Sequence, residues 1–408
     1  MELTLSEIKP ILKYIIENNK TLQDNGDFPI AVNLVGDAGC GKTSTIDQLA
    51  KEIGANYIKL NLAQISEPSD IVGWPLREHY VCRQDPNDPE NEECKWITPE
   101  LIDAFTKAGW QITEETRMSY AIPYWLKNID ENKPTILVLD DYSRAQPAVL
   151  QAVMEIICRQ EYISWRLPKN SHVICSSNPD DGSYNVNSLD EAFSSRLLNF
   201  NVKFDPQSWA AWAENHGLDG RGINFLLSYH HELMDRSKTK VAKVNARNYT
   251  MFINTISGIK DWSNSKSLAT ILQIASGCFL DEDDIVGGLF AQFVANKLDK
   301  LLSPEDLVTK DWSYVKGVLK SQLYDGDMYR ADIASIVTTR FVNYSLKLFS
   351  TKGTKTEIVV NRILDIIDND ETLLTEDLIF NLVKTLNKAY PARCNKLLLN
   401  PKIAKKLL

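Results

Sequence analysis

The sequence predicts an α/β protein with a parallel sheet of five strands covered by helices, followed by a region of helices alone. Short apolar, β-branched runs alternate with helix-like segments through the first 205 residues, which is typical of such a sheet. Beyond residue 205 the apolar residues recur at the three- and four-residue spacing of helices. A glycine-rich segment, residues 36–43, follows the first predicted strand directly.

Each predicted strand is a short apolar run bounded by turn residues or by a helical pattern, which favours a buried strand over a helix. The predicted strands are Ile30–Val35, Tyr57–Leu60, Thr135–Leu139, His172–Ser176 and Leu198–Val202. A helix is predicted before them, over Ile8–Ile16, because Thr4 and Glu7 have capping-box spacing. The helices predicted after them are Pro206–Asn215, Arg221–Asp235, Ala246–Ser257, Ser267–Cys278, Asp283–Leu298, Ala331–Phe349, Thr356–Ile367 and Glu376–Ala389.

These elements predict three regions: an α/β domain over residues 1–205, a helical lid over 206–308 and a helical C-terminal region over 309–408. Residues 77–98 are interpreted as an inserted β-hairpin, because two β-prone arms flank a tip rich in Pro, Asp, Asn and Glu. Cys82 and Cys94 can face each other across it. Seven scattered cysteines without a C-x-x-C pair are nevertheless typical of a reducing cytoplasm, where two free thiols are expected.

Composition and charge argue against several classes of protein. Since no apolar run reaches the roughly 18 residues that cross a bilayer, no membrane span is expected. The N-terminus MELTLSEIKP has no basic region followed by an apolar one, so no secretory signal is expected either. The net charge of −9 argues against nucleic-acid binding, which needs clustered Lys and Arg. With five histidines and no H-E-x-x-H motif, a structural metal is not expected.

The segment GDAGCGKT matches the pattern G-x-x-x-x-G-K-[ST] in full and lies between an apolar strand and a helix, as a phosphate-binding loop requires. Its glycines let the backbone N–H groups wrap around phosphate, and the helix N-terminus adds a positive dipole end. The predicted nucleotide-binding residues are Gly36, Asp37, Ala38, Gly39, Cys40, Gly41, Lys42, Thr43 and Ser44. We expect Lys42 to reach the β- and γ-phosphates of ATP and Thr43 to bind Mg²⁺. GTP remains open, because the loop reads phosphates and not the base.

The third predicted strand ends in two carboxylates, Asp140 and Asp141, within the segment TILVLDD. A buried strand of a parallel sheet presents such residues at its carboxyl end, beside the phosphate loop. We expect Asp140 to hold Mg²⁺ through water, and Asp141 to orient or deprotonate the water that attacks the γ-phosphate.

Four segments of the chain together resemble the MoxR-like and dynein-related branch of the AAA+ ATPases, over about residues 28–308. They are LDDYSRAQPAVLQAVMEII, ICSSNPDDGSYNVNSLDEAFSSRLLNFNV, SEPSDIVGW and VNARNYTMFIN. The resemblance implies that Asn178 is a sensor of the γ-phosphate or of the lytic water. It also implies that Arg196 is an arginine finger acting on a neighbouring subunit, and that Arg247 contacts the γ-phosphate of its own subunit.

The resemblance further implies a homo-oligomeric, hexameric ring and a protein client or partner that the ring remodels or matures. One position departs from the family, because the second carboxylate is usually Glu and here it is Asp141. The aspartate side chain is one methylene shorter, so its carboxylate oxygens lie about 1 Å further from the water. A displacement of that size can reduce the rate about 100-fold, and slow hydrolysis is therefore expected. Two alternatives remain: a scaffold that ATP locks with little turnover, and a nucleic-acid-acting AAA+ protein.

Overall fold

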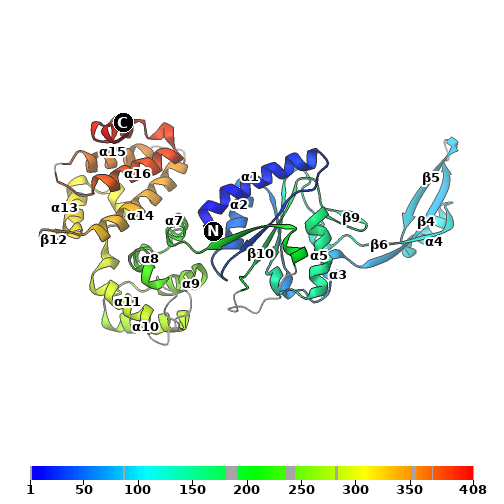
Figure 1. The fold of residues 1–408 in the computed structure, drawn as a ribbon, viewed down its shortest axis with the longest axis horizontal. Coiled ribbons are helices and arrows are strands. Elements are labelled where there is room, and N and C mark those ends of the chain that lie inside the picture. Colours follow the sequence, from blue (N-terminus) through cyan, green and yellow to red (C-terminus); the bar gives the residue numbers. More distant parts are fainter. Residues whose placement is uncertain are drawn as a thin grey trace. The chain divides into compact units, whose positions relative to one another are not determined.

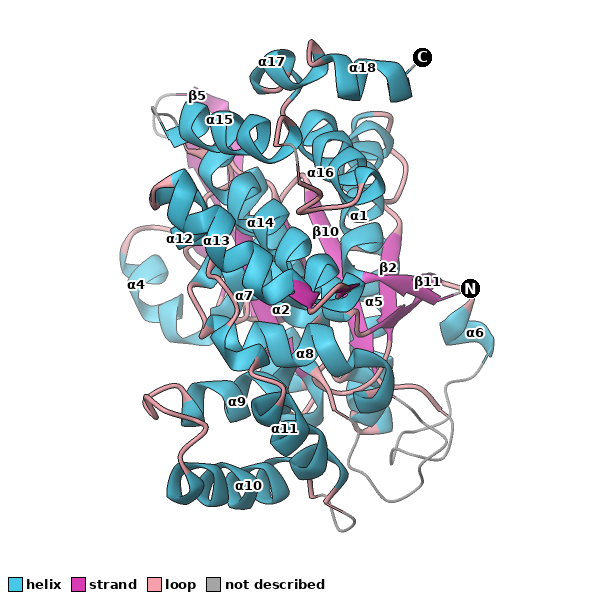
Figure 2. Cartoon of the chain, turned by 90° about the vertical axis from the view of Figure 1, so that its left-hand side faces the viewer, coloured by secondary structure: helices cyan, strands magenta, loops and turns pink. Residues whose placement is uncertain are grey.

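The computed structural model describes residues 2–85, 88–180, 191–234, 244–280, 284–351, 355–369 and 371–407. The chain divides into two compact units, Met1–Lys203 and Phe204–Leu408 (Figure 1). The first unit holds the strands of the α/β part, and the second is built almost entirely of helices (Figure 2). Among the described helices, none combines the length and the apolar character needed to cross a membrane.

The first unit is organised around a six-stranded parallel sheet in the order β1-β11-β2-β10-β7-β3. Its strands are β1 (Glu2–Thr4), β2 (Ala31–Val35), β3 (Asn56–Asn61), β7 (Thr135–Asp140), β10 (Ser171–Ser177) and β11 (Leu197–Lys203). The five predicted strands are all present. The prediction missed β1, because three residues are too short to show an alternating pattern, and only its pairing with β11 makes it a strand.

Helices cover both faces of this sheet (Figure 1). On one face lie α1 (Leu5–Asp24) and α2 (Lys42–Ile53), and on the other lie α3 (Ser69–Val72) and α5 (Pro147–Arg159). The predicted capping box begins α1: Thr4 Oγ1 accepts a hydrogen bond from the Glu7 backbone, and the Thr4 backbone N–H donates to the Glu7 carboxylate. The apolar side of α5 packs on β7 and β10 and closes the core on its face.

The insertion is larger than the predicted hairpin of residues 77–98. Strands β4 (Pro75–Asp85) and β5 (Asp88–Ile97) form that hairpin, and β6 (Gln111–Tyr120) joins the free edge of β4 in an antiparallel sheet. A helix, α4 (Ile102–Lys107), lies between β5 and β6, and a small core of Val81, Ile97 and Trp110 forms there. Strand β6, QITEETRMSY, was not predicted because it is exposed along most of its length and lacks apolar alternation.

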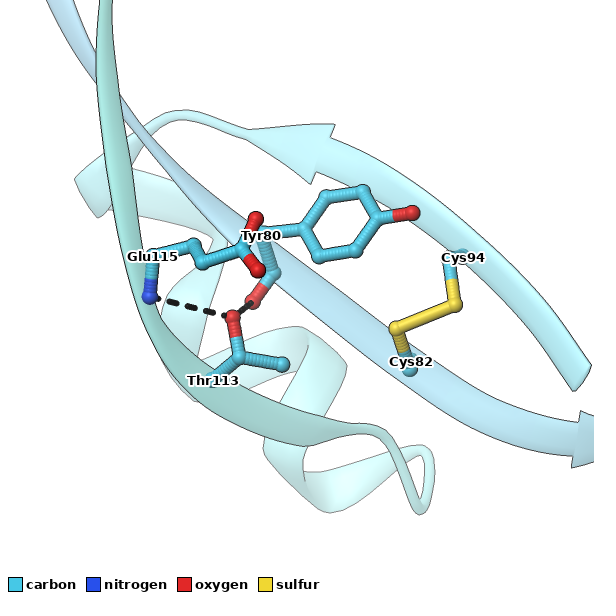
Figure 3. The surroundings of a disulfide bond; sticks show 5 residues. All are labelled: Tyr80, Cys82, Cys94, Thr113 and Glu115. Carbon is cyan, nitrogen blue, oxygen red and sulfur yellow. Dashed lines mark hydrogen bonds between the residues drawn. A yellow bond between two sulfur atoms is a disulfide. The ribbon is translucent and has the colours of Figure 1, made fainter.

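Cys82 and Cys94 form a disulfide within this sheet, so the expectation of two free thiols is wrong (Figure 3). They occupy directly opposed positions of β4 and β5, with their Cα atoms 4.1 Å apart. Directly opposed side chains of antiparallel strands are close neighbours. On the same strand, the Tyr80 backbone carbonyl accepts a hydrogen bond from Thr113 of β6 (Figure 3). The pairing follows from the strand register, which composition does not reveal.

Gly73 lies where the chain enters the insertion, at the end of the SEPSDIVGW segment. Its φ is +88° and its ψ is 169°, a conformation that is essentially restricted to glycine. A Cβ atom at this position would lie 1.8 Å from the Ala121 carbonyl oxygen. The Ala121 N–H in turn donates to the Trp74 carbonyl at 2.8 Å, so the two ends of the insertion are joined here.

We predict that Gly73→Ala destabilises the protein by about 2–4 kcal/mol, because the new methyl group must displace the Ala121 carbonyl in addition to straining φ. Gly109→Ala is the matched control. Gly109 has a similar φ of +84° but open space around its Cβ position, so only about 1 kcal/mol is expected there. Urea unfolding of both variants measures the difference. Equal losses would show that Ala121 moves aside freely.

The remaining strands and short helices are distributed over both units. They are β8 (Glu161–Tyr162), β9 (Trp165–Arg166), β12 (Tyr324–Asp325), β13 (Met328–Tyr329), α6 (Glu191–Ser194), and the 3₁₀ helices η1 (Leu62–Gln64), η2 (Pro99–Leu101), η3 (Tyr124–Leu126), η4 (Tyr142–Arg144), η5 (Leu298–Lys300) and η6 (Pro391–Arg393). The Ser164 hydroxyl, in the turn between β8 and β9, bonds to the backbone of Tyr120, and so joins this hairpin to the last residue of β6.

The helices of the second unit share one hydrophobic core, which includes residues from both sides of the predicted division at residue 308. They are α7 (Pro206–His216), α8 (Gly220–Leu233), α9 (Ala246–Ile256), α10 (Ser265–Phe279), α11 (Ile285–Ala295), α12 (Pro304–Thr309), α13 (Trp312–Leu323), α14 (Ala331–Ser350), α15 (Lys355–Ile367), α16 (Glu376–Ala389), α17 (Asn395–Leu398) and α18 (Pro401–Leu407). The predicted helix ends Asp235 and Asp283 lie outside the described residues. A buried Arg340–Glu214 pair, 3.0 Å long, joins α14 to α7.

Candidate nucleotide site

The predicted phosphate loop connects β2 to α2. Gly39 and Gly41 have φ values of +76° and +107°, which glycine adopts without strain. Gly36 begins the loop in close contact with β11, since a Cβ there would lie 2.3 Å from the Val202 carbonyl oxygen. Because α2 begins at Lys42, the unpaired N–H groups of its first turn lie at the end of the loop. This geometry is that of an anion-binding site.

The Lys42 side chain folds back into the loop that precedes it. Its Nζ donates to the backbone carbonyls of Gly36 at 2.6 Å and of Asp37 at 3.0 Å. The residue is only 7% exposed, although it carries a charge. A buried ammonium group held by carbonyl oxygens is in position to exchange those contacts for phosphate oxygens.

Asp140 ends β7 and lies among three polar side chains. Its Oδ1 accepts hydrogen bonds from Thr43 Oγ1 at 3.2 Å and from Ser176, and its Oδ2 pairs with Lys59 Nζ at 2.7 Å. Burial by itself would raise the pKa of Asp140, but the hydrogen bonds from Lys59, Ser176 and Thr43 and the charge of Lys59 lower it below its usual value. Asp140 is therefore a carboxylate at neutral pH.

The Thr43 hydroxyl and the Asp140 carboxylate suit a hard divalent cation, because Mg²⁺ prefers oxygen ligands of these kinds. They come from α2 and β7, which are distant in sequence. The predicted metal-binding pair is thus brought together beside the phosphate loop.

Asp141 follows β7 and has a left-handed backbone, with φ of +53° and ψ of +34°. Aspartate and asparagine tolerate this conformation better than most residues, because their short polar side chains bond locally. The conformation therefore gives a physical reason for an aspartate at this position. The side chain is partly exposed, next to the Asp140 end of the strand.

Asn178 lies directly beyond β10, which runs between β2 and β7. In the sheet Ser177 pairs with Val35, and the Gly36 N–H donates to the Ser177 carbonyl at 3.1 Å. Asn178 therefore lies next to the start of the phosphate loop, and its side chain is buried, with 6% exposed. Its contact with the γ-phosphate or the lytic water stays a prediction.

The two predicted arginines lie on elements other than the phosphate loop, β7 and β10. Arg196 precedes β11 and is exposed. Its guanidinium lies beside Cys158 at the end of α5: burial raises the pKa of the Cys158 thiol, and the charge and hydrogen bond of Arg196 oppose that shift. Arg247 is exposed in the first turn of α9, in the second unit, after the Asn245 cap. Their roles stay predictions.

Sequence reasoning missed Lys59 and Ser176, the two further partners of Asp140. Both residues lie inside predicted strands, which were identified by their apolar residues. The available signal was a lysine in the middle of the otherwise apolar run Tyr57–Leu60. The partner of such a lysine can be named only from the strand order, which places β3 beside β7.

One comparison with known proteins, a family match, agrees with this geometry. Residues 31–197 match the sequence model of the AAA domain of the dynein-related subfamily. No curated protein matches the chain. Among solved structures, a point mutant of RuvB from Thermotoga maritima matches with 12% identity, a TM-score of 0.29, and coverage of 99% of this chain and 90% of that one. A proposed ATPase from Cytophaga hutchinsonii ATCC 33406 matches with 15% identity, a TM-score of 0.30, and coverage of 93% and 88%. The family match covers residues 31–197, and this range includes the phosphate loop, Asp140 and Asn178.

Proposed function

We propose that the protein is a magnesium-dependent ATPase of the MoxR-like type, which works as a ring of identical subunits in the cytoplasm and remodels or matures a protein client. One observation carries the proposal: the Thr43 hydroxyl is held against the Asp140 carboxylate beside a loop that buries the Lys42 ammonium group. These three groups are what binding of a metal–triphosphate requires.

Each residue then has a distinct task. The backbone N–H groups of the loop and the Lys42 ammonium bind the phosphates, and Thr43 and Asp140 hold Mg²⁺. When bound, Mg²⁺ neutralises charge on the phosphate oxygens. Asp141 orients the attacking water or accepts its proton, and the Asn178 amide holds the water or the γ-phosphate in place.

Arg196 is proposed to act between subunits. It is exposed at the end of the α/β unit, and an arginine there can stabilise transition-state charge on a neighbour's nucleotide. Arg247 would contact the γ-phosphate within its own subunit. The proposed ring is hexameric, and the insertion of β4, β5 and β6 is the element proposed to move the client as the nucleotide changes.

A nucleotide-locked scaffold is the second candidate. It is favoured by Asp141, whose carboxylate reaches less far than that of Glu, and whose left-handed backbone gives an aspartate a reason to be there. The two candidates differ in turnover and not in ATP binding.

The test is the ATP hydrolysis rate per subunit, measured over a wide range of protein concentration. A rate that climbs from near zero to a plateau is expected, because Arg196 completes each site only after assembly. Arg196→Ala should bind ATP normally and remain at the baseline, about 1,000-fold or more below the plateau. The control is Arg159→Ala, which removes an exposed arginine near the same cysteine. ATP binding with a rate near zero at every concentration would favour the scaffold.

A further inference from the structure

The Asp140 carboxylate already has a cation beside it. Lys59 Nζ lies 2.7 Å from Oδ2, whereas Oδ1 is the oxygen bonded to Thr43 and Ser176. The two carboxylate oxygens therefore have different partners. One is bonded to the first turn after the phosphate loop, and the other is paired with β3.

The sheet places Lys59 at this carboxylate. In the β3–β7 register, Lys59 pairs with Val138 and Asn61 pairs with Asp140, so the lysine side chain extends along the neighbouring strand toward its carboxyl end. The Lys59 side chain is 41% exposed and that of Asp140 is 11% exposed. The acid is therefore largely shielded from solvent, so salt screens the pair less than it screens a surface ion pair.

This lysine opposes a divalent cation at the Thr43–Asp140 oxygens. The Lys42 ammonium adds a second positive charge inside the adjoining loop. Two ammonium groups thus oppose a divalent cation here before any phosphate arrives. The phosphates of ATP add negative charge that outweighs this opposition.

We propose that Lys59 keeps the site from binding a divalent cation by itself, so that the metal enters only together with the nucleotide phosphates. This inference rests on the proposed function, because it assumes that Thr43 and Asp140 hold Mg²⁺. Lys59 is here a counter-charge and positioning residue for Asp140, and it does not touch the nucleotide.

The test uses the full chain without nucleotide and Mn²⁺ as the probe for Mg²⁺, with free Mn²⁺ followed by electron paramagnetic resonance. Lys59→Met keeps the length of the side chain and removes its charge. We expect it to bind Mn²⁺ about tenfold more tightly than the natural protein does, the order expected for removal of a partly screened charge next to a divalent ion. Lys59→Gln should show the same gain, and provides a second variant should Lys59→Met fold poorly.

Two control variants separate charge from general disturbance. Lys59→Arg keeps the charge and should leave Mn²⁺ binding unchanged. Lys133→Met removes an exposed lysine that pairs with Asp130 before the other end of β7, and should also have no effect. Mn²⁺ binding by Lys59→Met and Lys59→Gln that is equal to or weaker than that of the natural protein would overturn the inference.

A further titration distinguishes this failure from failure of the proposed function. With ATP present, the natural protein should retain Mn²⁺ after unbound Mn²⁺–ATP is removed by gel filtration, because the phosphates complete the site. If it does so, and Lys59→Met shows no increase in Mn²⁺ affinity without nucleotide, only the proposed role of Lys59 is wrong. If ATP brings no Mn²⁺ to the natural protein, the proposed magnesium site itself is wrong.

Discussion

Replacing Lys42 with alanine is expected to weaken ATP binding by about 100-fold or more. The Lys42 ammonium is buried inside the phosphate loop, and each charge-assisted hydrogen bond that it can make to phosphate is worth about 1.5–3 kcal/mol. Alanine also leaves the Gly36 and Asp37 carbonyls without this donor. Isothermal titration with ATP and Mg²⁺ measures the loss.

Lys51→Ala is the matched control for that measurement. Lys51 lies on the same helix, but its side chain is 74% exposed and pairs with Asp47 one turn away. Such a surface pair contributes about 0.5 kcal/mol, and ATP affinity should not change. If the Lys42→Ala protein binds ATP as tightly as the Lys51→Ala protein does, residues 36–43 are not the phosphate-binding loop.

Asp141→Asn is expected to reduce ATP turnover by about 100-fold or more while ATP remains bound. Asparagine has the same shape as aspartate and also tolerates the left-handed backbone, so the fold is preserved. It lacks the charge needed to orient the attacking water and to take its proton. Phosphate release and retention of labelled ATP on the protein measure the two halves of this result.

Asp141→Glu serves as the comparison, because it keeps the charge and extends its reach. We expect it to raise turnover by about tenfold, since the carboxylate moves about 1 Å closer to the water. It should also lower the free energy of unfolding by about 1 kcal/mol, because glutamate is less suited to a left-handed backbone. Unchanged turnover in Asp141→Asn would show that another group positions the water.

The strength of each sequence signal explains what could be predicted. The phosphate loop and the two aspartates were predictable because their chemistry depends on fixed spacing next to buried strands. The five central strands were predictable because burial on both faces makes them continuous apolar runs. Strand β6 could not be predicted, because an exposed strand whose edge contacts are made by backbone atoms places few demands on its side chains.

The sequence by itself determined the α/β class, the loop that begins at Gly36, and the position of Asp140 at the end of a strand. Only the tertiary structure decided which side chains meet there, because Lys59, Thr43 and Ser176 reach Asp140 from three elements whose neighbourhood depends on strand order. The disulfide between Cys82 and Cys94 likewise depends on the register of β4 and β5. The spacing of nearby residues determines local elements and loops, whereas the pairing of distant segments is decided by the packing of the whole unit.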